Sequence, residues 1–290
     1  MTFDLVTFGD SWTKGCGVGY EKGMSQEEYD GIFNNTELGD RYAYRAVLAK
    51  KWGCKNINFS CMGSSNMRQF RHAVEFFKSK PERRTVVLWA TTSIFRHEVW
   101  MNKRKKGDKG YINLIYNHEY NLLKCKNEVR EVSPFNSDTL WTVFKSKPEK
   151  QVKNAIERGG VNIDDHIINH HDKENELRVL SNQMDHWNLF FDLLGVENYW
   201  IDTDITHEYK SVNSRMLFKD KPRRDLLSML VQDTEVKLTP SGDQYERKCK
   251  ASRLGLVSPY SGHPTKESHI KIADMIDEEI KLINNIQQDF

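Results

Sequence analysis

The stretch Phe3-Asp4-Leu5-Val6-Thr7-Phe8-Gly9-Asp10-Ser11 opens the chain with a short apolar run that stops at a Gly-Asp-Ser turn. A run of this length, bounded by turn residues, is typical of a buried strand. Two similar runs follow, at Asn56–Ser60 and at Thr85–Ala90. Helical spacing predicts a helix over Asp40–Trp52 and another from Ser64 or Ser65 to about Lys78. The order is therefore strand, helix, strand, helix, strand, which predicts an α/β fold with a parallel sheet and right-handed crossovers.

The pattern is less regular beyond residue 96. Residues 96–173 carry charge runs without clean periodicity, and we interpret them as an insertion with some helix of its own. Helical spacing returns at Leu177–Leu194, and Asn198–Asp202 predicts a further strand. Residues 203–256 form a second insertion with one helix near residues 224–231, and a long helix follows Thr265. We expect a single domain over 1–290, with Phe70, Val74 and Phe77 facing its core.

Composition excludes several classes of protein. The 43 Lys and Arg nearly balance the 41 Asp and Glu, giving a net charge of +2, whereas a dedicated nucleic-acid binder usually carries a strong basic excess. No apolar stretch approaches the roughly 20 residues that a membrane-spanning helix needs. Five cysteines, an odd number without a Cys-x-x-Cys pair, argue against a disulfide scaffold or a zinc site. The N-terminus does not resemble a signal peptide, so we expect a cytoplasmic protein with reduced thiols and no cofactor.

Polar groups follow each predicted strand. Ser11 ends the first, Gly63 follows the second, Thr91-Thr92-Ser93 follow the third, and Asp202-Thr203-Asp204 end the fourth; Gly262-His263-Pro264 precede the last helix. Ligands bind at the carboxyl ends of parallel strands, so these groups are expected to meet at one edge of the sheet. A hydroxyl, an imidazole and backbone N–H donors are the groups that acyl transfer requires.

The chemistry assigns a role to each group. Ser11 is the candidate nucleophile, and His263 is the candidate base that takes its proton and later returns it to the leaving group. The tetrahedral intermediate carries an oxyanion that needs preorganised donors. The backbone N–H groups of Ser11 and Gly63 are the candidates for this oxyanion hole.

Three blocks of the sequence resemble the SGNH (GDSL-type) hydrolases. Phe8-Gly9-Asp10-Ser11 is similar to the first family block, Asn58-Phe59-Ser60-Cys61-Met62-Gly63 to the second, and Gly262-His263-Pro264 to the last. The resemblance covers the first third and the C-terminal end of the chain. It implies a three-layer α/β/α sandwich around a central parallel sheet, and the activity of an esterase, lipase, thioesterase or carbohydrate deacetylase. The Asn, Lys and Ile content and the insertions are reminiscent of phage-encoded relatives.

The sequence departs from the family pattern at two positions. The family has an asparagine after the third strand, where this chain has Thr92, whose hydroxyl becomes a candidate third oxyanion donor. The family also has an aspartate three residues before the histidine, where this chain has Tyr260. A histidine without its carboxylate is less well oriented. Asp202, Asp204 or a backbone carbonyl are the candidate substitutes.

We therefore expect a serine esterase that acts on a small-molecule or carbohydrate ester, with an O-acetyl group on a carbohydrate as the favoured substrate. The alternative is a catalytically weakened binding or assembly module, because two family polar groups are replaced. A weaker alternative is a metal-dependent hydrolase built on His166 and His170, which are four residues apart. The favoured interpretation needs no metal.

Overall fold

The computed structural model describes eleven parts of the chain, which between them hold the predicted nucleophile and base. These are residues 3–79, 81, 83–92, 96–101, 110–116, 129–131, 139–143, 173–203, 215–221, 224–232 and 244–288.

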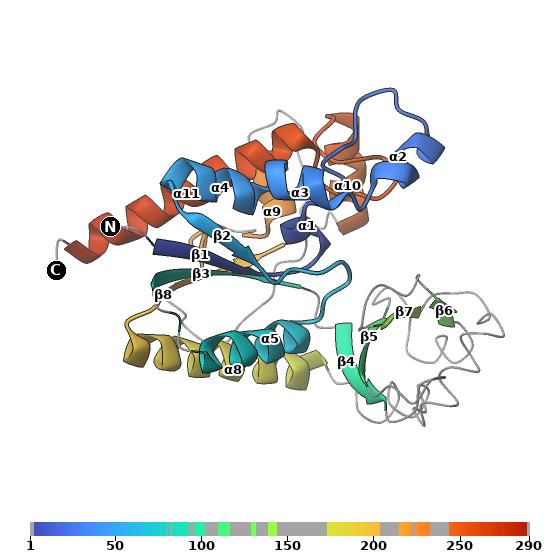
Figure 1. The fold of residues 1–290 in the computed structure, drawn as a ribbon. Helices are drawn as coiled ribbons and strands as arrows, with labels where there is room; N and C mark the ends of the chain where they lie inside the picture. Colours follow the sequence, from blue (N-terminus) through green and yellow to red (C-terminus); the bar gives the residue numbers. More distant parts are fainter. Residues whose placement is uncertain are drawn as a thin grey trace.

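A four-stranded, all-parallel sheet forms the centre of the fold (Figure 1). Its strands are β1 (Phe3–Phe8), β2 (Lys55–Asn58), β3 (Arg84–Thr91) and β8 (Glu197–Asp202), in the order β2-β1-β3-β8. Val6 pairs with Ile57 on one side and Val87 on the other, and Thr91 pairs with Asp202. The prediction of an α/β fold with a parallel sheet is confirmed. All four strands run the same way, so their carboxyl ends lie along one edge.

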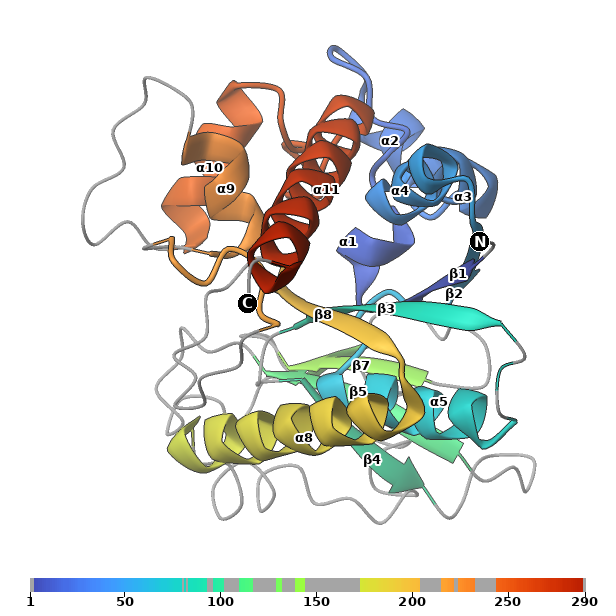
Figure 2. The same cartoon turned by 90° about the vertical axis from the view of Figure 1, so that its left-hand side faces the viewer.

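Helices cover both faces of this sheet (Figures 1 and 2). One face carries α4 (Tyr44–Trp52) and α11 (Lys266–Gln288), and the other carries α5 (Asn66–Lys78) and α8 (Lys173–Leu194). Successive strand side chains point to opposite faces. Leu5 and Leu88 therefore lie in the apolar core between the sheet and helices α4 and α11, which we call the first core. Val6 and Trp89 lie in the apolar core between the sheet and helices α5 and α8, which we call the second core. Burial on both faces explains why β1 and β3 are almost continuously apolar.

The second core is largely aromatic. Trp89 stacks on Trp200 with ring centroids 4.8 Å apart, and on Phe8 at 4.4 Å. Phe70 and Phe77 are buried as predicted, but Val74 is 50% exposed. The buried stripe of α5 runs through Ala73 instead, because the helix is rotated so that this small side chain faces the sheet.

The predicted helix over Asp40–Trp52 is two helices. α3 (Thr36–Tyr42) ends and α4 begins at Ala43, whose φ of −60° and ψ of 147° are extended. Two further short helices precede them, α1 (Ser11–Lys14) and α2 (Gln26–Ile32). The sequence showed no break at Ala43, because alanine is the residue that favours helix most.

The two predicted insertions contain regular structure. In the described parts of residues 96–173 the chain forms strands rather than helix: β4 (Arg96–Met101), β5 (Gly110–Tyr116), β6 (Val129–Glu131) and β7 (Thr139–Val143), in the order β4-β5-β7-β6. The second insertion holds the expected helix, α9 (Leu226–Gln232), and an additional one, α10 (Gln244–Arg253). Across the residues that the structure describes, no helix combines the length and the apolar character needed to cross a membrane.

Candidate active site

The nucleophile turn begins where β1 ends. Gly9 is required there, since a Cβ at this position would lie 2.0 Å from Oγ1 of Thr13. Asp10 then caps α1 by accepting a hydrogen bond from the backbone N–H of Trp12 at 2.9 Å. Ser11 is the first residue of α1 and is only 5% exposed. The local sequence thus places the hydroxyl at the carboxyl end of β1 on a rigid turn.

The histidine lies on a compact loop that precedes α11. The backbone N–H of Ser258 donates to the carbonyl of His263 at 2.8 Å, and the N–H of Gly262 donates to the carbonyl of Ser258 at 2.8 Å. Gly262 has a φ of +68°, which favours glycine. Val257 and Pro264 form an antiparallel bridge across the base of the loop. These backbone contacts fix the position from which the imidazole extends.

Ser11 and His263 meet in space, although 252 residues separate them along the chain. Nε2 of His263 lies 2.7 Å from Oγ of Ser11. In the tautomer that carries its hydrogen on Nδ1, Nε2 accepts the serine proton, which is the arrangement of a general base beside its nucleophile. The two predicted side chains are therefore within hydrogen-bond distance.

The second oxyanion candidate lies on the loop after β2. The backbone N–H of Cys61 donates to the carbonyl of Gly9 at 3.1 Å, which joins this loop to the start of the nucleophile turn. Gly63 follows with a φ of +66°, and Ser65 caps α5 by accepting from the N–H of Arg68. Of the two predicted caps, Ser65 is the one used. The positive φ explains why glycine is needed at position 63.

Thr92 lies beside the nucleophile turn, and its hydroxyl donates to Oδ2 of Asp10 at 3.1 Å. A hydroxyl has a single hydrogen, so in this conformation Thr92 supports the cap of α1 rather than an oxyanion. Asn66 holds the backbone of Thr92 through both amide atoms, each at 2.9 Å. The sequence reasoning missed Asn66. Its position as the first residue of α5, directly after the helix cap Ser65, was the available signal.

The candidates for orienting His263 have other contacts. Asp202 is fully buried and accepts from Oγ1 of Thr91 at 2.6 Å and from Nε of Arg224 at 3.2 Å. Asp204 lies outside the described residues. Tyr260, at the family position of the aspartate, donates its hydroxyl to the carbonyl of Met24 at 2.7 Å. These contacts tie Asp202 to the end of β3 and Tyr260 to the loop before α2.

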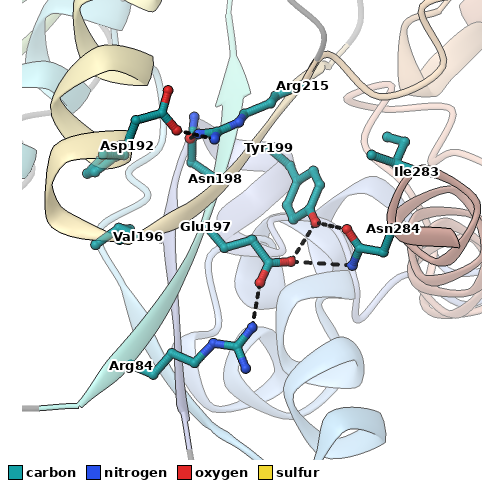
Figure 3. A pocket seen from close by; sticks show the side chains of 11 residues that line it. Arg84, Asp192, Val196, Glu197, Asn198, Tyr199, Arg215, Ile283 and Asn284 are labelled. Carbon is teal, nitrogen blue, oxygen red and sulfur yellow. Dashed lines mark hydrogen bonds and ion pairs between the residues drawn. The ribbon is translucent and has the colours of Figure 1, made fainter. Parts of the chain in front are cut away.

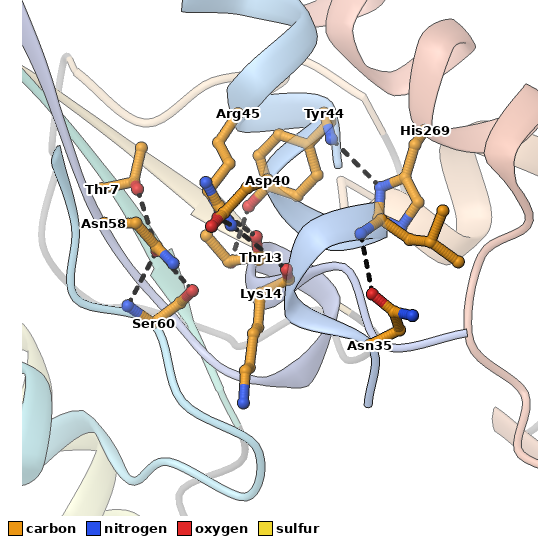
Figure 4. A network of polar contacts seen from close by, with 11 residues as sticks. Thr7, Thr13, Lys14, Asn35, Asp40, Tyr44, Arg45, Asn58, Ser60 and His269 are labelled. Atoms are coloured by element: carbon orange, nitrogen blue, oxygen red, sulfur yellow. Dashed lines mark hydrogen bonds and ion pairs between the residues drawn. The ribbon is translucent and has the colours of Figure 1, made fainter. Parts of the chain in front are cut away.

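A buried polar network joins α1 to α4 and α11 (Figure 4). The hydroxyls of Thr13 and Tyr44 are 2.7 Å apart, and Nε of Arg45 donates to the carbonyl of Thr13 at 3.0 Å. The N–H of Tyr44 donates to Nδ1 of His269 at 3.2 Å. Burial is the main cause that lowers the pKa of His269 to about 3, so this imidazole is neutral. The network joins the nucleophile turn to α4 and α11.

The segment around α2 forms a wall beside His263. The rings of Phe33 and His263 are 5.0 Å apart between centroids, at an interplanar angle of 76°. A Cβ on Gly17 would lie 2.7 Å from Cβ of His263 and 2.9 Å from the hydroxyl of Tyr29. The Tyr29 hydroxyl is in turn hydrogen-bonded to the Ser261 hydroxyl. The sequence analysis assigned no role to Phe33.

A polar cavity of about 440 Å³ lies at the opposite end of the sheet, where β3 and β8 begin (Figure 3). Its charged groups pair with each other: Arg84 with Glu197 at 2.9 Å, and Arg215 with Asp192. Tyr199 donates its hydroxyl to the same Glu197 at 2.5 Å. The lining is therefore electrically balanced, and it lies at the strand ends opposite to Ser11.

Metal ligands do not gather in the described part of the chain, where no group of three or more His, Cys, Asp or Glu side chains could hold an ion. His166 and His170, the proposed pair, lie outside the described residues. The four cysteines in the described part are not joined in disulfides.

No protein-family model and no curated protein matches this chain. The resemblance to SGNH hydrolases therefore stands on the three sequence blocks, and the chemistry of the site is argued from its geometry.

Proposed function

We propose that this protein is a serine ester hydrolase that works through an acyl-serine intermediate. The observation that carries the proposal is the 2.7 Å contact between Oγ of Ser11 and Nε2 of His263. The resemblance to the SGNH family agrees with it, as does the placement of helices on both faces of the sheet, which is the arrangement of the family's three-layer sandwich.

The reaction follows from the two side chains. His263 takes the proton of Ser11 as Oγ attacks the ester carbonyl carbon, and the N–H groups of Ser11 and Gly63 stabilise the resulting oxyanion. The intermediate collapses, the bond to the alcohol oxygen breaks, and His263 returns the proton to that oxygen. Water then attacks the acyl-serine with His263 again as base, which releases the carboxylic acid and restores Ser11.

An acetyl ester on a carbohydrate is the substrate class that we favour. The Phe33 ring packs against that of His263. Tyr260, three residues before His263 on the same loop, packs against Tyr20 and is 41% exposed. Since His263 delivers a proton to the leaving alcohol, groups beside it face that half of the ester. Aromatic rings suit the polar and apolar faces of a sugar better than a long acyl chain.

Ester hydrolysis and covalent labelling test the proposal directly. We expect the wild type to hydrolyse p-nitrophenyl acetate and to be labelled at Ser11 by a fluorophosphonate probe. Ser11→Ala and His263→Ala should lower the rate by roughly 10³-fold or more. Ser181→Ala is the matched control, because it removes a buried hydroxyl that donates to the carbonyl of Leu177 on α8. Equal turnover by the wild type and Ser11→Ala would refute the proposal.

The second candidate function is a binding or assembly module on the same fold. A groove of about 690 Å³ between α5 and α8 favours it, because Met67, Val74 and Phe190 line this groove and are exposed. In this case the fluorophosphonate would leave Ser11 unlabelled, because a serine in a purely structural role is not activated.

A further inference from the structure

Phe33, at the end of α2, packs against His263, the general base of the proposed active site. Its ring centroid lies 5.0 Å from that of His263, and the two planes are nearly perpendicular at 76°. Phe33 is the C-cap residue of α2 and is half-buried. Perpendicular ring pairs join the electron-rich face of one ring to the electron-poor edge of the other. The contact therefore has an electrostatic component as well as a packing one.

The position of Phe33 is fixed by contacts on several sides. The N–H of Gly17 donates to the carbonyl of Phe33 at 3.0 Å, and Gly17 itself lies against Cβ of His263. The Tyr29 ring lies 5.5 Å from the Phe33 ring, and its hydroxyl bonds to that of Ser261. The N–H of His263 donates to the same Ser261 hydroxyl at 3.4 Å. These contacts join α2 to the histidine loop as one unit.

The charge on His263 changes during the proposed reaction. The imidazole is neutral before it takes the Ser11 proton and is an imidazolium in the transition state. A cation within about 6 Å of an aromatic centroid is attracted by the ring, and a neutral group gains far less. A Phe33 ring that turns its electron-rich face toward His263 favours the transition state over the ground state, and only such a difference raises the rate of the chemical step.

We propose that Phe33 presents the face of its ring to His263 and stabilises the imidazolium form through a cation–π contact, with Tyr29 and Gly17 holding the two rings together. This inference rests on the proposed function, and it deepens it: Phe33 is a positioning residue that acts on the reaction through His263. The contact that stabilises His263 thus comes from the end of α2, which lies outside the sequence blocks that resemble the family.

Three ionisable groups in the surroundings of His263 keep their protonation state over the pH range in which a histidine titrates. Burial raises the pKa of Tyr29 and raises that of Cys16 to about 12, and burial lowers the pKa of His269 to about 3. All three are therefore neutral around pH 6.5, where an unperturbed histidine titrates. The Asp10 carboxylate on the nucleophile turn is common to the wild type and to every variant below. A change in the titration of His263 consequently reports the ring at position 33.

An NMR titration tests the contact without any need for turnover. We expect Phe33→Leu, which keeps an apolar side chain but loses the ring, to lower the pKa of His263 by about half a unit. The signal is assigned with His263→Asn, and the exposed His186 on α8 serves as the internal reference. A pKa of His263 that is unchanged or raised, with His186 unchanged, overturns the proposal. Because this readout ignores catalysis, it decides the contact even where the proposed function fails.

A fluorination series at position 33 separates electrostatics from packing. Fluorinated phenylalanines keep the shape of the ring while they withdraw the charge from its face, so the protein folds as the wild type does. We expect the fluorophosphonate labelling rate of Ser11 and kcat for p-nitrophenyl acetate to fall together, about threefold to tenfold across the series, with KM unchanged. The same series at Phe76, a half-buried phenylalanine on α5, is the control and should change neither rate. Constant rates across the series, or a rise in KM alone, overturn the proposal.

Discussion

Gly17→Ala should displace the proposed catalytic base, and the structure gives the size of the effect. The new Cβ would lie 2.7 Å from Cβ of His263, so one of them must move by about 0.7 Å to reach the 3.4 Å of ordinary contact. The Tyr29 hydroxyl would lie 2.9 Å from the same Cβ, so it crowds residue 17 as well. A shift of this size would stretch the 2.7 Å contact between His263 and Ser11. Misplacement of a catalytic group by about 1 Å can cost roughly 10²-fold in rate.

Gly23→Ala is the matched control. Gly17 has a φ of +86° and Gly23 a φ of +94°, so both substitutions force alanine into a conformation that costs about 1–2 kcal/mol. A Cβ on Gly23 meets nothing within 4 Å, whereas a Cβ on Gly17 meets the histidine. The two variants therefore share the backbone strain and differ in the contact.

The assay compares thermal unfolding with active-site reactivity in the two variants. We expect both to unfold at lower temperature than the wild type, but only Gly17→Ala to lose fluorophosphonate labelling and p-nitrophenyl acetate hydrolysis, by about 10²-fold. If Gly17→Ala is labelled as fast as Gly23→Ala, then His263 is not held by the contact with residue 17, and the reasoning is refuted.

Three further predictions concern buried polar contacts of the fold. Tyr44→Phe should lower the free energy of unfolding in urea by about 1–3 kcal/mol, because it leaves the buried Thr13 hydroxyl without the partner at 2.7 Å, and adding Thr13→Val should recover part of the loss. Burial lowers the pKa of His269 to about 3 from the 6.5 of an unperturbed histidine. The free energy of unfolding of the wild type should therefore fall by about 2–4 kcal/mol as the pH falls from 7 to 4, and His269→Asn should make this dependence on pH weaker. Burial raises the pKa of Asp277, but hydrogen bonds from Lys281, Lys51 and Trp52 outweigh it and lower the value from 3.8 to about 2. The wild type should therefore exceed Asp277→Asn in stability by about 1–2 kcal/mol above pH 4, and the difference should vanish as the pH falls through 2, while a constant difference would contradict this.

Local patterns predicted the frame of the fold. The runs at Phe3–Phe8 and Thr85–Ala90 became central strands, because a strand buried on both faces must be apolar almost throughout. The break at Ala43 and the strands β4 to β7 were missed, because neither leaves a clear pattern in the sequence. The exposure of Val74 was also missed, since helical spacing defines a stripe but not the rotation of that stripe against the sheet.

In the candidate site, too, local turns could be predicted from the sequence and long-range contacts could not. Short motifs were enough to predict the Gly-Asp-Ser turn, the glycine at 63 and the Gly-His-Pro loop, because backbone sterics and capping within a few residues dictate turn geometry. Three contacts arise from the packing of the folded chain: Ser11 meets His263, Thr92 bonds to Asp10, and the Phe33 ring packs against the imidazole. Such contacts join residues far apart in the chain. They depend on how sheet, helices and loops pack together, which no local stretch of sequence specifies.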